Sequence, residues 1–204
     1  MSVAAVITAD IVNSTLLATQ QEKKLVSQIS AVLKDHKFEF YRGDSFQIYC
    51  KDASRAYELV LHIRTIARSF SMMHDVRTSI GIGKVKTPVR VLRTATSEAF
   101  ILSGRAFDKL KNNSARTQIT SGNEKANTAL KIIAYYTDYL FTQLTPKQAA
   151  VVVVLLRGET QLQAAKKLKK APATINQHAQ SAGWLEMEKL VTEYKQVITQ
   201  FNLV

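Results

Sequence analysis

Residues 38–50, FEFYRGDSFQIYC, decide which fold this chain of 204 residues adopts. Two short runs rich in aromatic and β-branched residues, 38–41 and 45–50, flank the turn dipeptide Gly43-Asp44. Here the turn begins at Arg42. Two such runs around a glycine-containing turn are typical of a β-hairpin. The segment therefore predicts two antiparallel neighbours in one sheet.

The segments on either side of the hairpin set the order of the elements. Before it, residues 3–9 form a continuous apolar run, as in a strand buried on both faces, and residues 15–34 carry apolar residues at helical spacing. After it, Asp52 is placed to cap a helix that ends near Phe70, and residues 75–85 predict a fourth strand. The order β-α-β-β-α-β predicts an α+β, ferredoxin-like (palm-like) fold, in which an antiparallel sheet is covered by helices on one face.

Two glycines, Gly81 and Gly83, interrupt the predicted fourth strand. Because glycine weakens the interior of a strand, it indicates there either a bulge or a place where another backbone comes close. We expect a packing role for both.

The strand patterns end before the last third of the chain. A helix near residues 97–111 and a short strand near Gln118 extend the sheet domain, which we expect over residues 1–122. Residues 123–143 predict a helix that either connects two domains or adds a last layer to the first. Residues 144–204 predict an all-α helix-turn-helix domain.

Composition and charge narrow the classes of function. Hydrophobic residues make up 46% of the chain and Gly and Pro are few, which excludes disordered and collagen-like chains. The chain has 28 Lys and Arg residues and 16 Asp and Glu residues. The resulting net charge of +12 favours a phosphate-bearing partner. The single cysteine, the absence of a signal-peptide pattern and the lack of an apolar run of about 20 residues predict a soluble cytoplasmic protein without a membrane partner.

The last 60 residues contain two helix starts of the same type. Thr145, followed by Pro146 and Gln148, and Thr160, followed by Gln163, are capping-box patterns. Gly158 is placed to end the first of these helices, and Ala171-Pro172 breaks the second. We expect the helix pair of a helix-turn-helix to be held together by Ala165, Leu168 and Ile175, with Leu162 and Ala179 behind them.

In that arrangement the third helix presents short amides and hydroxyls to solvent. Such side chains can contact base edges in a major groove, and they are Thr174, Asn176, Gln177, Gln180 and Ser181. The preceding segment supplies Lys166, Lys167, Lys169 and Lys170, with no acidic residue between Thr160 and Trp184. We expect these residues to bind double-stranded DNA. The alternative is a plain helical bundle with a solvated lysine face.

Two carboxylates form a second candidate site. Asp10 closes the first predicted strand, and Asp44 lies in the hairpin whose strands pair beside it. Paired carboxylates at a sheet edge suit Mg²⁺ or Mn²⁺ that also contacts nucleotide phosphates, so the candidate metal ligands are Asp10, Ile11 and Asp44. Residues 11–15 lead into a predicted helix N-terminus, whose free N–H groups suit a phosphate; the candidate phosphate contacts are Asn13, Ser14 and Thr15. Alternatively, Asp10 caps a helix and Gly43-Asp44 is an ordinary turn.

Four motifs together resemble a known family. ADIVNST (9–15), YRGDSFQIY (41–49), VRTSIGIGKV (76–85) and SEAFILSGRAFD (97–108) are similar to the SatD-like family and, more remotely, to the palm-like domain of class III nucleotide cyclases. The cyclase resemblance implies metal binding at Asp10 and Asp44, and it places Asn13 where the family has a glycine. The segment from residue 144 to Trp184 resembles the helix-turn-helix of sigma-factor region 4, with Lys169 where a turn glycine is usual.

The cyclase pattern is incomplete in this sequence. The resemblance assigns a transition-state Asn and, four residues later, an Arg; Arg105 matches the Arg, but Ile101 stands at the Asn position. An aliphatic side chain cannot donate to developing charge, which argues against cyclase activity. Arg105 is then either a phosphate contact or an ion-pair partner of Glu98 or Asp108.

These observations favour a DNA-binding transcription regulator whose cyclase-like N-terminal domain is degenerate and binds a nucleotide or a metal ion. We expect a homodimer, as is usual for helix-turn-helix proteins. The alternative is an enzyme, a metal-dependent nucleotidyl cyclase or a nucleotidyltransferase-like protein. In a third reading, the palm-like domain is only a scaffold.

Overall fold

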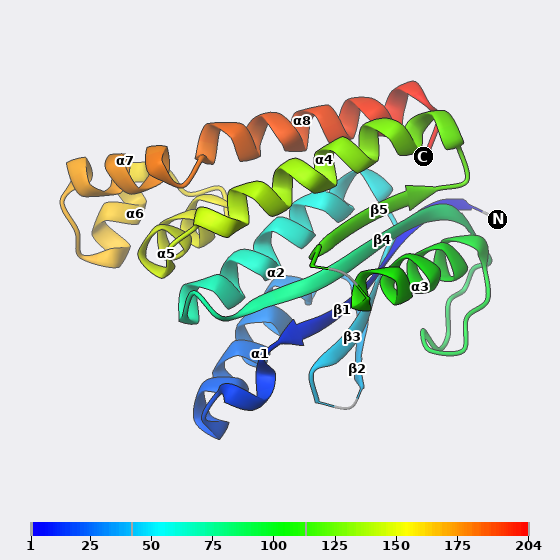
Figure 1. The fold of residues 1–204 in the computed structure, drawn as a ribbon, viewed down its shortest axis with the longest axis horizontal. Helices are drawn as coiled ribbons and strands as arrows, with labels where there is room; N and C mark the ends of the chain where they lie inside the picture. Colours follow the sequence, from blue (N-terminus) through cyan, green and yellow to red (C-terminus); the bar gives the residue numbers. More distant parts are fainter. Residues whose placement is uncertain (1, 42, 113, 204) are drawn as a thin grey trace.

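The computed structural model of the chain describes residues 2–41, 43–112 and 114–203. Arg42, in the predicted hairpin turn, lies outside the described residues. The described residues form a mixed α+β structure (Figure 1). Its strands are β1 (Ser2–Val12), β2 (Lys37–Tyr41), β3 (Ser45–Cys50), β4 (Asp75–Val85) and β5 (Thr117–Ser121). Its α-helices are α1 (Thr19–Leu33), α2 (Ala56–Phe70), α3 (Glu98–Lys111), α4 (Glu124–Gln143), α5 (Pro146–Leu155), α6 (Gln161–Leu168), α7 (Pro172–Ser181) and α8 (Trp184–Gln200).

The strands form one sheet in the order β2-β3-β1-β4-β5. Neighbouring strands run antiparallel in the pairs β2-β3, β3-β1 and β1-β4. The order β2-β3-β1-β4 is that of the predicted ferredoxin-like fold. The predicted fourth strand, residues 75–85, matches β4. β5 runs parallel to β4, because α3 returns the chain along the sheet between them.

Helices cover both faces of the sheet, and this corrects the expectation of a single covered face. Alternate residues of β1 point to opposite faces, as in any strand. Ala5 and Ile7 belong to the large core that contains residues of α1, α2 and α4, whereas Ala4 and Val6 pack with Ala99 of α3. The helix-period pattern of α3 could not show which face it covers, since that depends on the connection from β4.

Gly81 allows α3 to lie directly on the sheet. A Cβ atom at this position would lie 2.3 Å from the carbonyl oxygen of Ala99 and 2.3 Å from the amide nitrogen of Ser103, both in the backbone of α3. At Gly83 a Cβ would instead meet the side chain of Glu98. The expectation of close packing at these two glycines is confirmed.

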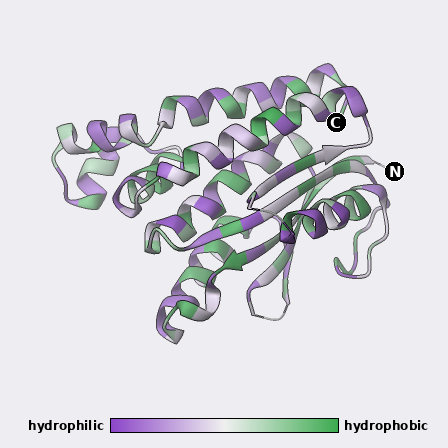
Figure 2. Ribbon diagram, in the orientation of Figure 1, coloured by the Kyte–Doolittle hydropathy of each residue, from purple (hydrophilic) through white to green (hydrophobic). Residues whose placement is uncertain are grey.

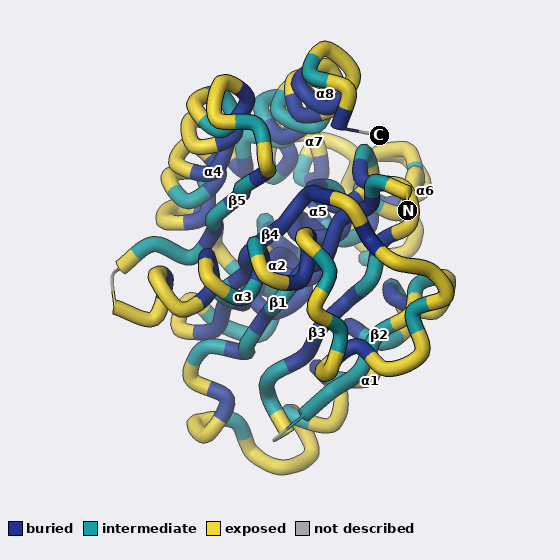
Figure 3. The backbone as a smooth tube through the Cα atoms, turned by 90° about the vertical axis from the view of Figure 1, so that its right-hand side faces the viewer, coloured by how far each residue is buried: buried dark blue, intermediate teal, exposed yellow. Residues whose placement is uncertain are grey.

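The C-terminal helices share the core of the sheet region. Residues on both sides of residue 122 contribute to one continuous hydrophobic cluster, in which α4 packs on β5 and α5 packs on α2. Tyr194 of α8 is buried against Tyr57 of α2, with ring centroids 5.3 Å apart, and its hydroxyl donates to the carbonyl of Ala53 over 2.9 Å. Figure 2 shows the mostly hydrophobic β1 at the centre, and Figure 3 shows buried residues along β1, β4 and α2, with exposed residues on the outer turns.

The segment after β1 differs from its prediction. The strand continues past Asp10 to Val12, because β4 is long enough to pair with it down to Asp75. Asp10 therefore lies inside the paired strand and does not close it. Asn13 then adopts a left-handed conformation with φ of 60°, a 3₁₀ turn covers Ser14–Leu16, and α1 begins only at Thr19.

Across the described ranges, no helix combines the length and the apolar character that crossing a membrane requires.

Candidate functional site

The helix starts of the C-terminal region are formed as predicted. The hydroxyl of Thr145 accepts from the N–H of Gln148, and the side chain of Gln148 accepts from the N–H of Thr145. The same reciprocal pair joins Thr160 and Gln163 at the start of α6. Gly158, with φ of 81°, follows the end of α5. These caps fix where α5 ends and α6 begins.

A small apolar core holds α5, α6 and α7 together. Ala165, Ile175 and Ala179 are buried in it, and Leu168 packs against it, as expected for the helix-turn-helix. Leu162, expected behind them, is 59% exposed. The reason is that Ala164, Ala165 and Leu168 form the buried stripe of α6, and Leu162 lies on another side of the helix.

The turn between α6 and α7 is tight, even though it contains no glycine. Lys169 takes the left-handed conformation at φ of 52°, and the N–H of Lys170 donates to the carbonyl of Ala165 over 3.0 Å. A glycine is usual at such a position because it has no Cβ to clash. Lys169 therefore occupies the place of the turn glycine in the same backbone conformation.

The expected DNA-binding residues lie on one projecting end of the molecule, which consists of α6 and α7 (Figure 1). Most are exposed and Thr174 is half-buried; they are Lys166, Lys167, Lys169, Lys170, Thr174, Asn176, Gln177 and Gln180. Lys167 forms an ion pair with Glu159, which lies just before the acid-free stretch noted in the sequence. For the other three lysines, the part of the chain that the structure describes provides no ion-pair partner.

The two predicted carboxylates lie near each other at the hairpin end of the sheet. The N–H of Ile11 donates to the carbonyl of Asp44 over 3.0 Å, while the Ile11 side chain is buried in the core. Burial raises the pKa of Asp10, the negative charge of Asp44 raises it further, and the positive charge of Arg77 opposes both. The two acids are therefore close enough to interact electrostatically.

Most of the carboxylate oxygens already have partners. Oδ2 of Asp10 lies 3.0 Å from Nη1 of Arg77, Oδ2 of Asp44 accepts from Ser14 Oγ over 2.9 Å, and Oδ1 of Asp44 accepts from Ser45 Oγ over 3.3 Å. Oδ1 of Asp10 is buried and unpartnered. No cluster of three or more His, Cys, Asp or Glu residues suited to a metal ion occurs in the described ranges. Because a hard cation needs several oxygen ligands, Mg²⁺ or Mn²⁺ would fit these residues only if Arg77 left Asp10.

The expected phosphate turn does not lead into a helix N-terminus. The 3₁₀ turn Ser14–Leu16 separates it from α1, and the side-chain amide of Asn13 donates through Nδ2 to the carbonyl of Met73 over 2.8 Å. Ser14 is buried and bonded to Asp44, whereas Thr15 is exposed. The left-handed conformation of Asn13 is one that a glycine adopts readily, consistent with the glycine that the resemblance places there.

Arg105 and Ile101 lie on α3, and both are exposed, Ile101 by 41%. Among the ion pairs found within the described residues, none joins Arg105 to Glu98 or Asp108. Instead, the carboxylate of Glu98 accepts from the N–H of Lys84 over 2.9 Å. Neither expected ion pair of Arg105 is formed among the described residues.

Sequence reasoning missed Arg77 and Glu159, the two residues that neutralise predicted site residues. Arg77 stands directly opposite Asp10 in the β1-β4 register, so it could be identified only once the pairing of these strands was known. Glu159 precedes α6 and lies eight residues before Lys167, outside the i, i+3 and i, i+4 spacings that predict an ion pair on a helix, so the sequence pattern alone could not identify it.

No protein-family model matches the sequence, and no curated protein sequence is significantly similar to it. Solved structures show remote similarity. The GGEEF domain of a diguanylate cyclase from Vibrio cholerae is 18% identical over 60% of this chain and 85% of its own, with a TM-score of 0.41. A bacterial light-regulated adenylyl cyclase is 12% identical over 58% of this chain and 43% of its own, with a TM-score of 0.39.

A regulator of polyketide synthase expression from Bifidobacterium adolescentis is similar over nearly the whole length, 97% of this chain and 81% of its own. Its identity is 12% and its TM-score is 0.34. The chain thus has a remote structural similarity to the cyclase palm domain and to this regulator. Because the values are this low, we base no argument about function on them.

Proposed function

We propose that the protein is a DNA-binding transcription regulator, in which α7 enters the major groove and the α6-α7 turn contacts the phosphate backbone. The single observation that carries this proposal is the juxtaposition of exposed amides on α7 with three lysines, at the end of α6 and in the turn after it, that have no ion-pair partner among the described residues. Side chains such as Asn176 and Gln177 can form paired hydrogen bonds with adenine, and lysines neutralise phosphates. The similarity to the SatD-like family and to sigma-factor region 4 that the sequence motifs indicate is part of the same proposal.

The geometry of the projecting end supports a docking role. α6 and α7 lie at one end of the molecule, beyond the sheet (Figure 1). The capping boxes at Thr145 and Thr160 and the buried Ile175 and Ala179 hold the helices in fixed positions. Rigid elements of this kind position base-contacting side chains reproducibly.

Replacing Lys166, Lys169 and Lys170 with glutamine tests the phosphate contacts. Binding of a labelled duplex to the full chain, measured by fluorescence anisotropy at several salt concentrations, is expected to weaken, because three phosphates lose their lysine contacts and fewer counterions are released on binding. We expect the slope of log K against log salt to lose about 2–3 in magnitude, at ~0.9 per phosphate contact.

The matched control replaces three exposed lysines elsewhere, Lys23, Lys24 and Lys125, with glutamine, so that the net charge of both variants is the same. The control should keep the wild-type slope. Equal slopes for the two variants would mean that binding follows overall charge alone, and the proposed docking surface would be wrong.

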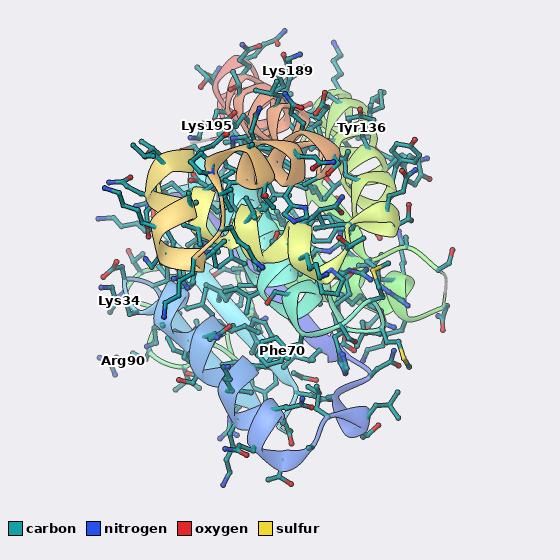
Figure 4. The ribbon with its side chains drawn as sticks, turned by 90° about the vertical axis from the view of Figure 1, so that its left-hand side faces the viewer. Lys34, Phe70, Arg90, Tyr136, Lys189 and Lys195 are labelled. Carbon is teal, nitrogen blue, oxygen red and sulfur yellow. The ribbon has the colours of Figure 1, made fainter. Side chains whose placement is uncertain are left out.

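We also propose that the protein binds DNA as a homodimer. An exposed apolar face on α4 supports self-association; it consists of Ile132, Tyr135, Tyr136 and Tyr139. Figure 4 shows Tyr136 on the outer surface of α4. Exposed apolar groups gathered in one place often mark an interface. Such a dimer reads two half-sites about 34 Å, or one helical turn, apart.

A metal-dependent nucleotide enzyme is the second candidate, and one observation favours it. Oδ1 of Asp10 is buried without a partner beside Asp44. Binding of Mg²⁺ or Mn²⁺ with a nucleotide at Asp10, Ile11 and Asp44 requires that Arg77 first release Asp10. Phosphate contacts from Asn13, Ser14, Thr15 or Arg105 belong to this candidate.

Incubation of the full chain with each nucleoside triphosphate and Mn²⁺ tests this second candidate. If it is correct, chromatography will show consumption of a nucleotide that stops in both Asp10→Asn and Asp44→Asn. Intact nucleotides in every reaction, or equal turnover by the wild type and both variants, would exclude it.

A further inference from the structure

A pocket of about 550 Å³ lies where the sheet region meets the C-terminal helices. Its walls come from the end of α1 and the residues after it, from the first turns of α2, and from the residues that follow α5. Its charged and titratable lining side chains include Lys34, His36, Arg55, Glu58, His62 and Arg157. The pocket is distinct from the Asp10-Asp44 site, because Asp44 lies in the β2-β3 turn and His36 precedes β2 at the opposite end of that hairpin.

The charge around this pocket is predominantly positive. Lys34, Arg55 and Arg157 line it from three separate elements, and within the described part of the chain none of them has an ion-pair partner. Of the two acids in the lining, Asp35 is exposed, and Glu58 lies 3.8 Å from Lys195 Nζ. In Figure 4, Lys34 lies at the end of α1 that is directed toward α6. With Glu58 next to Lys195, three cations stand against one other acid, Asp35, and this positive balance favours an anionic ligand.

His62 adds an independent sign of a ligand. It lines the pocket and is only 8% exposed, and its Nε2 atom is buried without a hydrogen-bond partner. Burial and the nearby charge of Arg157 lower the pKa of His62 to about 4, despite a hydrogen bond to the backbone of Val153. The imidazole is therefore neutral at pH 7. Since unsatisfied buried polar atoms are rare, and Nε2 is covered in this structure, a small movement of the His62 side chain toward the cavity would let Nε2 accept from a polar group of a bound molecule.

The size and the polar groups together define the class of ligand. A volume of about 550 Å³ is within the range of small-molecule pockets and is larger than inorganic phosphate requires. Arginine and lysine favour a phosphate group, and the neutral His62 favours a hydroxyl or amino group on the same molecule.

We propose that this pocket binds a phosphorylated small molecule of nucleoside monophosphate size, and that its binding regulates the α6-α7 unit. Arg55 and Arg157 contact the phosphate group, and His62 contacts the remainder of the ligand. Regulation rests on the proposed DNA-binding function, whereas ligand binding does not.

The position of Arg157 explains how a ligand would act on the DNA-binding end. Arg157 immediately precedes Gly158, whose left-handed conformation sets the direction of the chain into α6. Arg55 directly precedes α2 and His62 lies in the second turn of α2, so a ligand held by all three residues joins the sheet region to this junction. A ligand with different affinity for two positions of α6 and α7 shifts their equilibrium.

Isothermal titration of the full chain with the four 5′-nucleoside monophosphates, glucose 6-phosphate and inorganic phosphate tests the binding. At least one organic phosphate should bind, and its unphosphorylated counterpart and citrate should not. Arg55→Gln and Arg157→Gln, both at exposed positions, should each weaken binding about 10-fold or more, as loss of a charge-assisted contact predicts. The matched control is Arg93→Gln, another exposed arginine, which should bind as the wild type does.

Three outcomes would overturn the proposed pocket. One is the absence of binding by every phosphorylated compound at millimolar concentration. Another is binding that both arginine variants retain. A third is binding that Asp10→Asn abolishes and Arg157→Gln leaves intact, because the ligand then lies elsewhere. Equal affinity for citrate would overturn the assignment to phosphates.

Regulation is tested by repeating duplex binding with and without the bound compound. The dissociation constant for DNA should change about 5-fold or more in the wild type, in line with typical coupling, and should not change in Arg157→Gln. No change in the wild type would overturn regulation. If the protein binds no duplex at all, the proposed DNA-binding function fails, whereas the titration with organic phosphates still decides whether the pocket binds them.

Discussion

Replacing Arg64 with methionine is expected to lower the free energy of unfolding by about 4 kcal/mol, as is typical when one partner of a buried ion pair is removed. Arg64 is fully buried in α2, and its guanidinium forms two bonds with Asp75, of 2.9 and 2.8 Å. It also donates to Asp138 and to Thr117, each over 2.6 Å, and it lies 4.0 Å from the ring centre of Phe141. The network joins α2, β4, β5 and α4.

The loss follows from what the substitution leaves behind. Methionine is similar in size to the aliphatic part of arginine, so the packing changes little, but Asp75 and Asp138 remain with most of their compensation removed. Arg68, which lies 3.2 Å from Asp75, is the only other ion-pair partner of Asp75 within the described residues. Urea unfolding of the full chain measures the effect, with Arg93→Met as a matched exposed control that should be neutral. A loss below about 1 kcal/mol, the range of an exposed ion pair, would contradict the assigned role.

Replacing Gly81 with alanine is expected to cost about 3 kcal/mol, at the upper end of overpacking substitutions. The added methyl group would overlap the backbone of α3 at Ala99 and Ser103, and neither backbone can move without separating the helix from β4. The cost should appear as a lower midpoint of urea unfolding.

The matched control for this prediction lies in the same helix. A Cβ at Gly104 of α3 would have no atom within 4 Å, so Gly104→Ala should raise the stability by about 1 kcal/mol through helix propensity. If Gly81→Ala were as stable as the wild type, α3 could not lie on the sheet as described.

Periodicity and turn chemistry were sufficient for much of the fold, because these signals are local. The span of β4, the hairpin strands and the capping boxes at Thr145 and Thr160 could be predicted from adjacent residues alone. Gly81 also carried a usable signal, since a glycine inside a strand pattern indicates a close approach of another segment. The segment that approaches Gly81 is α3, on the second face of the sheet. Its placement depends on the path of the chain over more than ten residues.

The candidate sites were less predictable because they depend on register and on distant partners. Asp10 looked like a free carboxylate at a strand end, but β1 continues past it and brings Arg77 opposite. Lys169 looked unsuitable for a tight turn, yet the packing of Leu168 and Ile175 holds it in a left-handed conformation. The pocket at His62 combines residues from three parts of the chain and has no sequence motif.

Selection of duplexes from a random-sequence pool by the full chain tests directly whether α7 reads bases. We expect enrichment of one sequence, arranged as two inverted half-sites for a dimer, and binding at least ~1,000-fold tighter than to unrelated duplexes. Gln177→Ala should lose part of this preference while keeping its affinity for unrelated DNA. A pool that stays unenriched, or a Gln177→Ala variant with unchanged preference, would contradict the claim.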